Sequence, residues 1–175
     1  MFKNKTRQLT IDAMLAAMCA VLGYLAIDVT SLKITFESVP VLIGALLFGP
    51  VDGAMIGLIG TLIYQLLKYG VSATTVLWIA PYVLCGLIVG AFAKLRRFQF
   101  SQTQMLVLVV LAELMVTVLN TGVIYVDSKL YGYYYPAIIT GNLALRLVIC
   151  VGKAVAYALV LPPLLKILRK RSVTA

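Results

Sequence analysis

Long apolar stretches, separated by short polar or glycine-containing segments, make up most of this chain. A helix needs about 20 mostly apolar residues to cross a bilayer, and fewer where other helices enclose it. The pattern predicts six membrane-spanning helices, at residues 10–27, 38–48, 51–67, 74–93, 104–125 and 136–167. The second is short for a full crossing, and Gly49-Pro50 predicts a tight turn after it. The expected fold is an all-α membrane protein, a compact six-helix bundle forming a single domain over residues 1–175.

The amino-acid composition excludes several classes of protein. Hydrophobic residues make up 62% of the 175 residues and charged residues only 12%, whereas a soluble domain is about half apolar and about a quarter charged. A soluble enzyme, a disordered tail and a nucleic-acid-binding domain therefore fit poorly, and no nucleic acid partner is expected. Histidine is absent, and the three cysteines all lie within predicted spans, where they suit packing. No metal site and no cofactor are expected.

The net charge of +9 is distributed unevenly along the chain. With six spans, ten cations lie on the side of the termini, against three on the other side. Positively charged loops remain cytoplasmic, so both termini are expected in the cytoplasm of a bacterium, with the helices in its plasma membrane. The same cations favour anionic lipid headgroups. The ten are Lys3, Lys5, Arg7, Lys94, Arg96, Arg97, Lys166, Arg169, Lys170 and Arg171.

Small residues recur at helical spacing. Gly49, Gly53 and Gly57 repeat every four residues, and Gly86 and Gly90 do so in the fourth span. Such spacing lets helix backbones approach closely in lipid, so we expect the glycines to pack within the bundle. The first span carries an alanine stripe that suits either internal packing or a partner membrane protein: Ala13, Ala16, Ala17 and Ala20.

Polar residues inside the spans are costly and normally face the interior or a partner. Glu113 and Asn120 are seven residues apart on one helix face, as are Arg146 and Lys153. Because the fifth and sixth helices run antiparallel, Glu113 should pair with Lys153, or bind ligand itself, while Asn120 meets Arg146 in the outer half. Arg146 then lacks an acidic partner within the spans, and its planar guanidinium suits a carboxylate or phosphate ligand.

Aromatic and amide side chains gather at the same outer level. The set comprises Phe36, Gln65, Tyr69, Trp78 and Tyr82. Rings together with one Arg and amides suit a flat, conjugated, acidic small molecule. The tyrosines at residues 131–135 are instead typical of an interfacial aromatic belt.

Catalysis finds little support in the sequence. No metal-ligand set, no nucleophile with an adjacent base and no phosphate-binding glycine loop is present. The chain is therefore not expected to be an enzyme or to carry its own ATPase site. Two rival hypotheses are a ligand-free assembly subunit of a membrane complex and a small membrane enzyme using Glu113 and Lys153.

Several motifs resemble those of the substrate-binding S components of energy-coupling factor (ECF) vitamin transporters. They are the alanine stripe, the run from Ile34 to Gly53 with its Phe-Gly-Pro-x-x-Gly ending, the Leu87-Ile-Val-Gly90 segment and the Asn120-Thr121 pair. The resemblance covers nearly the whole chain.

The resemblance implies a mechanism. Such a subunit binds a vitamin from outside in the outer half of its bundle, and the outer loops close over it. Its first-span alanines dock on a transmembrane coupling subunit bound to two ATPases, and the S component topples in the membrane to deliver the vitamin to the cytoplasm.

The vitamin is less well defined than the family. Folate is the first choice, because its rings can stack and its glutamate carries carboxylates. Many folate-type members have an aspartate in the third span, however, and residues 58–65 contain no acid here. Pantothenate, riboflavin and thiamine- or pyridoxine-related molecules therefore remain alternatives.

Overall fold

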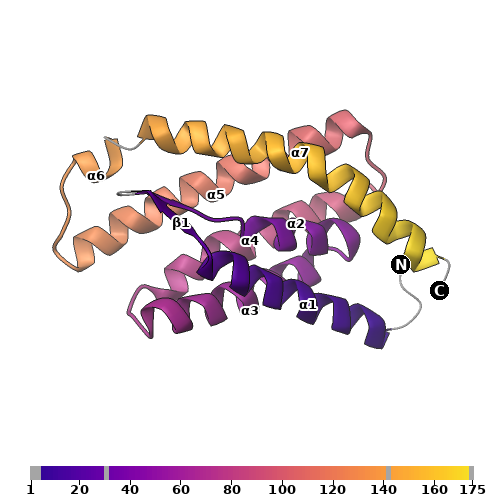
Figure 1. Ribbon diagram of the computed structural model, residues 1–175, viewed down its shortest axis with the longest axis horizontal. Helices are drawn as coiled ribbons and strands as arrows, with labels where there is room; N and C mark the ends of the chain where they lie inside the picture. Colours follow the sequence, from indigo (N-terminus) through magenta and orange to yellow (C-terminus); the bar gives the residue numbers. More distant parts are fainter. Residues whose placement is uncertain (1–4, 30–31, 141–142, 174–175) are drawn as a thin grey trace.

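The computed structural model describes residues 5–29, 32–140 and 143–173, which form a bundle of helices lying along one long axis (Figure 1). Helices α5 and α7 pack on each other along one side of the bundle, and α1 and α3 pack along the opposite side, with α2 and α4 between them. The elements are α1 (Lys5–Tyr24), β1 (Ile27–Val29), β2 (Leu32–Ile34), α2 (Ser38–Leu47), α3 (Pro50–Tyr69), α4 (Thr75–Leu95), α5 (Gln102–Leu130), α6 (Ala137–Thr140) and α7 (Leu143–Val173).

The described part of the chain is helical, as predicted, apart from one short β-hairpin. Helix α1 ends at Tyr24, and Ile27, expected within the first span, belongs to β1. This strand pairs antiparallel with β2, with Ile27 opposite Ile34. β-branched residues favour extended backbone, and they are frequent between residues 27 and 35.

Two other boundaries differ from the prediction. Helix α5 continues to Leu130, five residues beyond the expected end at 125. The expected sixth span, 136–167, consists of the short helix α6 and the long helix α7, with residues 141 and 142 outside the described part of the chain.

Four helical segments are long and apolar enough to cross a membrane: α3, α4, α5 and the α6–α7 segment over residues 137–168. Helix α1 does not meet these criteria, and α2 is a shorter apolar helix of 10 residues. At about 1.5 Å per residue, α2 covers only about half of a bilayer core. Its Val41, Leu42 and Leu46 are fully buried, so α2 is an internal helix of the bundle.

Glycines bring the backbones of α3 and α4 together, as their spacing predicts. A Cβ on Gly86 would lie 2.3 Å from the carbonyl carbon of Gly53, and one on Gly90 would lie 2.4 Å from Pro50. The turn before α3 is made by Gly49, whose φ of 115° suits glycine, followed by Pro50 in the first turn. These contacts fix α4 against α3 at backbone distance.

The turn between α4 and α5 has an unusual backbone. The amide of Phe98 donates to the carbonyl of Ala93 and that of Arg97 donates to Lys94, the pattern of a Schellman C-cap. Arg97 and Phe98 have φ values of 51° and 60°, although such positions normally favour glycine. Ser101 then starts α5 with a capping box, exchanging hydrogen bonds with Gln104.

Candidate ligand-binding site

A cavity of about 510 Å³ opens between the helices. The helix ends that line it lie at the end of the bundle opposite the start of α1 (Figure 1). Its walls come from the last turns of α3, the first turns of α4, the second half of α5, the first half of α7 and the segment that precedes α2. Its volume is in the range of sites for small organic ligands. The cavity occupies the half of the bundle in which the sequence predicts a ligand site.

Most of the predicted site residues line this cavity. They are Arg146, Asn120, Trp78, Tyr82, Gln65, Tyr69 and Lys153. The two exceptions are Phe36, which is partly buried and packs against the core, and Glu113, which is fully buried.

Arg146 is the cationic side chain of the cavity wall with the fewest protein partners. Its Nη1 donates to the hydroxyl of Thr121 at 3.3 Å, and its buried Nε has no hydrogen-bond partner among the described residues. The buried side-chain oxygen of Asn120, one residue before Thr121, also lacks a partner within this part of the chain. Donor and acceptor groups therefore remain open toward the cavity on both α5 and α7.

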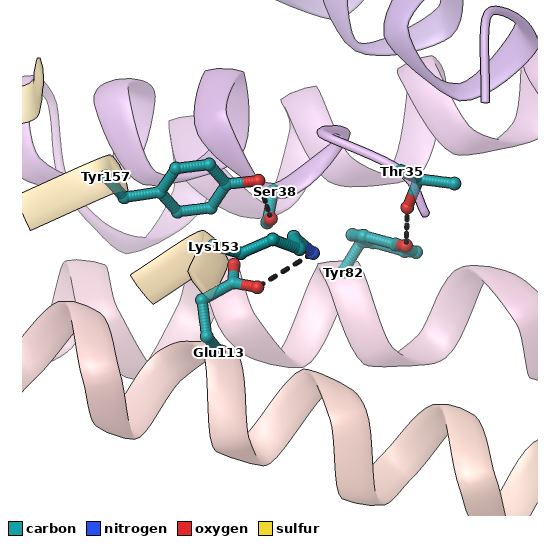
Figure 2. Close-up of polar contacts among 6 residues, drawn as sticks. All are labelled: Thr35, Ser38, Tyr82, Glu113, Lys153 and Tyr157. Atoms are coloured by element: carbon teal, nitrogen blue, oxygen red, sulfur yellow. Dashed lines mark hydrogen bonds and ion pairs between the residues drawn. The ribbon is translucent and has the colours of Figure 1, made fainter. Parts of the chain in front are cut away.

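Lys153, two turns further along α7, is neutralised by the protein. Its Nζ lies 2.8 Å from Oε2 of Glu113, whose side chain is fully buried (Figure 2). The predicted ion pair is therefore confirmed, although its alignment is not that of a hydrogen bond and Oε1 of Glu113 has no partner among the described residues. The pair leaves no net charge on the cavity floor.

Two pairs of hydroxyl groups lie near the Glu113–Lys153 ion pair, and Thr35 and Tyr82 among them line the cavity (Figure 2). Tyr157 and Ser38 share a hydrogen bond of 3.2 Å, and Tyr82 and Thr35 share one of 3.4 Å (Figure 2). Phe36, predicted to contact ligand, instead packs against the core, with its ring 6.3 Å from that of Tyr157. Phe36 does not line the cavity, whereas its neighbours Thr35 and Glu37 do.

Glu37, a carboxylate that the sequence analysis did not single out, also lines the cavity and is 2% exposed. It lies close to α1, since a Cβ on Gly23 would come within 2.9 Å of its carboxyl carbon and 2.8 Å of the Tyr64 ring. Gly23 thus makes room for an acidic side chain at the base of the cavity.

Asp127, a second carboxylate, lies at the mouth of the cavity. It accepts hydrogen bonds from Thr74 at the start of α4 and from Tyr133 after α5, and the indole nitrogen of Trp78 lies 3.5 Å away. Partial burial is the main cause that raises the pKa of Tyr133 to about 12, and the nearby Asp127 contributes to the increase. The phenol is therefore a hydrogen-bond donor at neutral pH. Asp127 joins two loops that border the opening.

Helical spacing in the sequence could have identified Asp127. It follows Asn120 by seven residues, as Asn120 follows Glu113, so the spacing places all three on one helix face. Asp127 was missed because the span was expected to end at residue 125. Tyr131 and Tyr133, assigned to an interfacial belt, line the cavity as well. Arg146 forms no ion pair among the described residues, but two carboxylates from outside the expected spans, Glu37 and Asp127, border the same cavity.

The alanines of α1 do not form one surface. Ala13 and Ala17 are exposed beside Met14 and Met18. Ala16 and Ala20 are 4% and 7% exposed, and a Cβ on Gly60 of α3 would lie 2.8 Å from the Ala16 carbonyl oxygen. In this chain Ala16 and Ala20 therefore pack internally, and the predicted docking face reduces to Ala13, Ala17 and the neighbouring methionines.

Comparison with known protein families decides the identity of the chain. Residues 7–167 match the family model described as "ECF transporter, substrate-specific component". The chain belongs to this family. An ECF S component is a membrane protein that binds the substrate of a transporter and associates with an ECF module; it is not an enzyme. No curated protein sequence matches this S component.

Solved structures show the same fold. FolT bound with folic acid has a TM-score of 0.68 and 22% identity, over 89% of this chain and 91% of that one. The S component of a bacterial ECF transporter has a TM-score of 0.69 and 21% identity, over 94% of this chain and 99% of that one. An S component for biotin has a TM-score of 0.64 and 19% identity, over 97% of this chain and 95% of that one.

Proposed function

We propose that this S component captures a water-soluble vitamin in the cavity at the Arg146 end of the bundle and delivers it to the cytoplasm with an ATP-driven coupling module. The observation that carries the proposal is Arg146, a half-buried guanidinium on the cavity wall with one hydroxyl partner and an open Nε. A buried charge requires a counter-charge, and an anionic group of a ligand supplies one.

The cavity also suggests the character of the ligand. Arg146 suits a carboxylate, while the side-chain oxygen of Asn120 and the carboxylates of Glu37 and Asp127 suit amino or ring N–H groups. Trp78, beside Asp127, offers a ring for stacking. Folate has groups of all three kinds and is our first candidate, with pantothenate, riboflavin and thiamine- or pyridoxine-related molecules as alternatives.

Mass spectrometry of the chain purified in detergent from a bacterial membrane tests this proposal. We expect one vitamin at near-stoichiometric amount and, if it is the favoured folate, a molecule that carries both a carboxylate and a conjugated ring. A neutral aliphatic molecule would contradict the proposed ligand chemistry. Protein without any small molecule, together with no binding to a panel of vitamins, would favour an assembly subunit.

We further propose that both termini are cytoplasmic and that Ala13 and Ala17 contact the transmembrane coupling subunit. These residues are exposed on α1, beside Met14 and Met18, and small residues permit close helix approach. Ala17→Trp should retain ligand binding but lose at least tenfold of the uptake measured with the coupling module. Ala16→Trp is the internal control and should lower Tm, because Ala16 faces α3. Lost ligand binding in Ala17→Trp would contradict a docking role.

A further inference from the structure

An apolar groove of about 410 Å³ lies between α4 and α5, and no residue of α1 lines it. Its walls include Phe92 of α4 and Val107, Leu111 and Met115 of α5. From Thr103 to Met115 it follows α5 for about 18 Å, at about 1.5 Å per residue. Half of a bilayer core is about 15 Å thick, so the groove is about one lipid leaflet deep.

Cations lie at one end of this groove. Lys94, Arg96 and Arg97 are exposed in and before the α4–α5 turn, and the Arg96 guanidinium lies 5.6 Å from the ring centroid of Phe92, which lines the groove. The sequence has no Asp or Glu between residues 53 and 112, and these three cations form no ion pair among the described residues. An apolar groove thus leads to a cluster of positive charges.

The backbone of the turn supplies an independent observation. Arg97 has a left-handed φ of 51° at the position directly after the C-cap residue Arg96 of α4, where glycine is strongly preferred. The sequence therefore places a charged side chain at a position where glycine would fit the backbone better. Departures of this kind from local preference are expected at functional sites.

We propose that the groove and the turn bind one anionic phospholipid, with an acyl chain along Val107 and Leu111 and the phosphate group against Arg96 and Arg97. The length of the groove, the apolar walls and the cationic end match the parts of such a lipid in order. A transmembrane helix of a partner would run through the whole bilayer core, about 30 Å, which exceeds the groove.

Native mass spectrometry tests this site on the full chain in an uncharged detergent. The protein is titrated with dioleoyl phosphatidylglycerol and, separately, with dioleoyl phosphatidylcholine, and bound lipids are counted. We expect one phosphatidylglycerol to bind at least tenfold more tightly than phosphatidylcholine. The double variant Arg96→Gln/Arg97→Gly should lose this preference, whereas Lys166→Gln, which removes an exposed cation from α7, should keep it.

Two further variants separate the site from general effects. Arg97→Gly alone should weaken phosphatidylglycerol binding while leaving Tm unchanged or higher, because glycine suits the left-handed backbone. Leu111→Trp fills the groove and should lower lipid affinity at least tenfold, and Val107→Trp serves the same purpose if Leu111→Trp lowers Tm. Val118→Trp, on α5 outside the groove and 68% exposed, is the matched control and should bind normally.

Three results would overturn the proposal. The first is equal affinity for the two lipids. The second is an equal effect of Leu111→Trp and Val118→Trp on lipid affinity. The third is a dimer of the chain that Leu111→Trp abolishes while lipid binding persists, because the groove would then be an interface between two copies.

Discussion

Arg146 and Lys153 lie on the same face of α7, but their electrostatic surroundings differ. Lys153 has a buried carboxylate 2.8 Å away, whereas Arg146 has one hydroxyl and no ion pair among the described residues. A charge already neutralised gains little from a ligand, while one without a counter-ion gains much. We therefore propose separate roles for the two cations: Lys153 stabilises the cavity floor and Arg146 recognises the ligand.

The role of Arg146 predicts a loss of affinity on truncation. Arg146→Ala should raise the Kd for the co-purifying ligand at least tenfold, about 1.4 kcal/mol, because the charged partner of its anionic group is gone. Isothermal titration of ligand-free protein measures this. Arg146→Lys keeps the positive charge but not the planar guanidinium, so its Kd should lie between those of the unchanged protein and Arg146→Ala. An unchanged Kd in Arg146→Ala would show that Arg146 does not contact the ligand.

The Glu113–Lys153 pair predicts a stability effect. Lys153→Met leaves Glu113 as a fully buried, uncompensated carboxylate and should cost about 3–5 kcal/mol of unfolding free energy. The double variant Glu113→Leu/Lys153→Met removes both charges and should recover most of it. Thermal unfolding in detergent measures both, and a double variant no more stable than the single one would contradict a pair that is only mutually neutralising.

Residue spacing predicted part of this site. Glu113 and Lys153 were matched because helix rise fixes depth and antiparallel packing brings equal depths together. The orientation of Phe36 could not be predicted, because a segment outside the helices has no helical period to indicate which way its side chains point. Glu37, in the same segment, was missed for the same reason, whereas Asp127 was missed only because the helix was ended too early.

At the level of elements, the contact between α3 and α4 depends on the absence of side chains. The backbone of Gly53 fills the place where a Cβ on Gly86 would be. Without a hydrophobic effect between helices in lipid, such close contact supplies the association energy through van der Waals packing. The glycine spacing predicted this packing, because it follows directly from helix geometry.

Gly86→Ala should therefore be destabilising. The added methyl must displace one helix, and overpacking of this kind costs about 1–3 kcal/mol, which a drop in Tm in detergent reports. Gly152→Ala in α7 is the matched control, because no atom lies within 4 Å of the added Cβ; alanine there should be neutral or stabilising. Equal effects at the two positions would mean that helix propensity, not packing, dominates.

The hairpin and α2 were harder to predict than the long helices. A buried apolar helix of 10 residues and a membrane span have the same composition, and only length separates them. The β1–β2 pairing depends on contacts between two strands of three residues each, too few to produce a visible alternation. Local sequence thus predicted the long elements, and tertiary context determined the short ones.

At the scale of the whole molecule, the charge distribution predicts an orientation. Lys129 lies at the cavity end and Lys94 at the opposite end, and both are exposed. We expect Lys129→Cys to react with a membrane-impermeant maleimide on intact cells, while Lys94→Cys reacts only after lysis, because cationic loops stay inside. The native Cys19, Cys85 and Cys150 are buried and free, so they should give little background.

Labelling of the Lys94→Cys variant, but not of Lys129→Cys, on intact cells would reverse the orientation and place the cavity on the cytoplasmic side. Labelling of neither would indicate an inaccessible loop, which denaturing the cells before labelling would reveal. The Lys129→Cys variant without maleimide serves as the control for expression.

The grouping of the helices has a consequence for synthesis. Helices α1 to α4 contact one another extensively and are consecutive in the chain, while α5, α6 and α7 follow as a second packed group. Because a ribosome delivers the chain from its N-terminus, the surface of α1 with Ala13 and Ala17 is complete while α5 and α7 are still unmade. Arg146 is synthesised late, so the nascent protein forms the α1 surface proposed for docking before it forms the cavity proposed to bind a ligand.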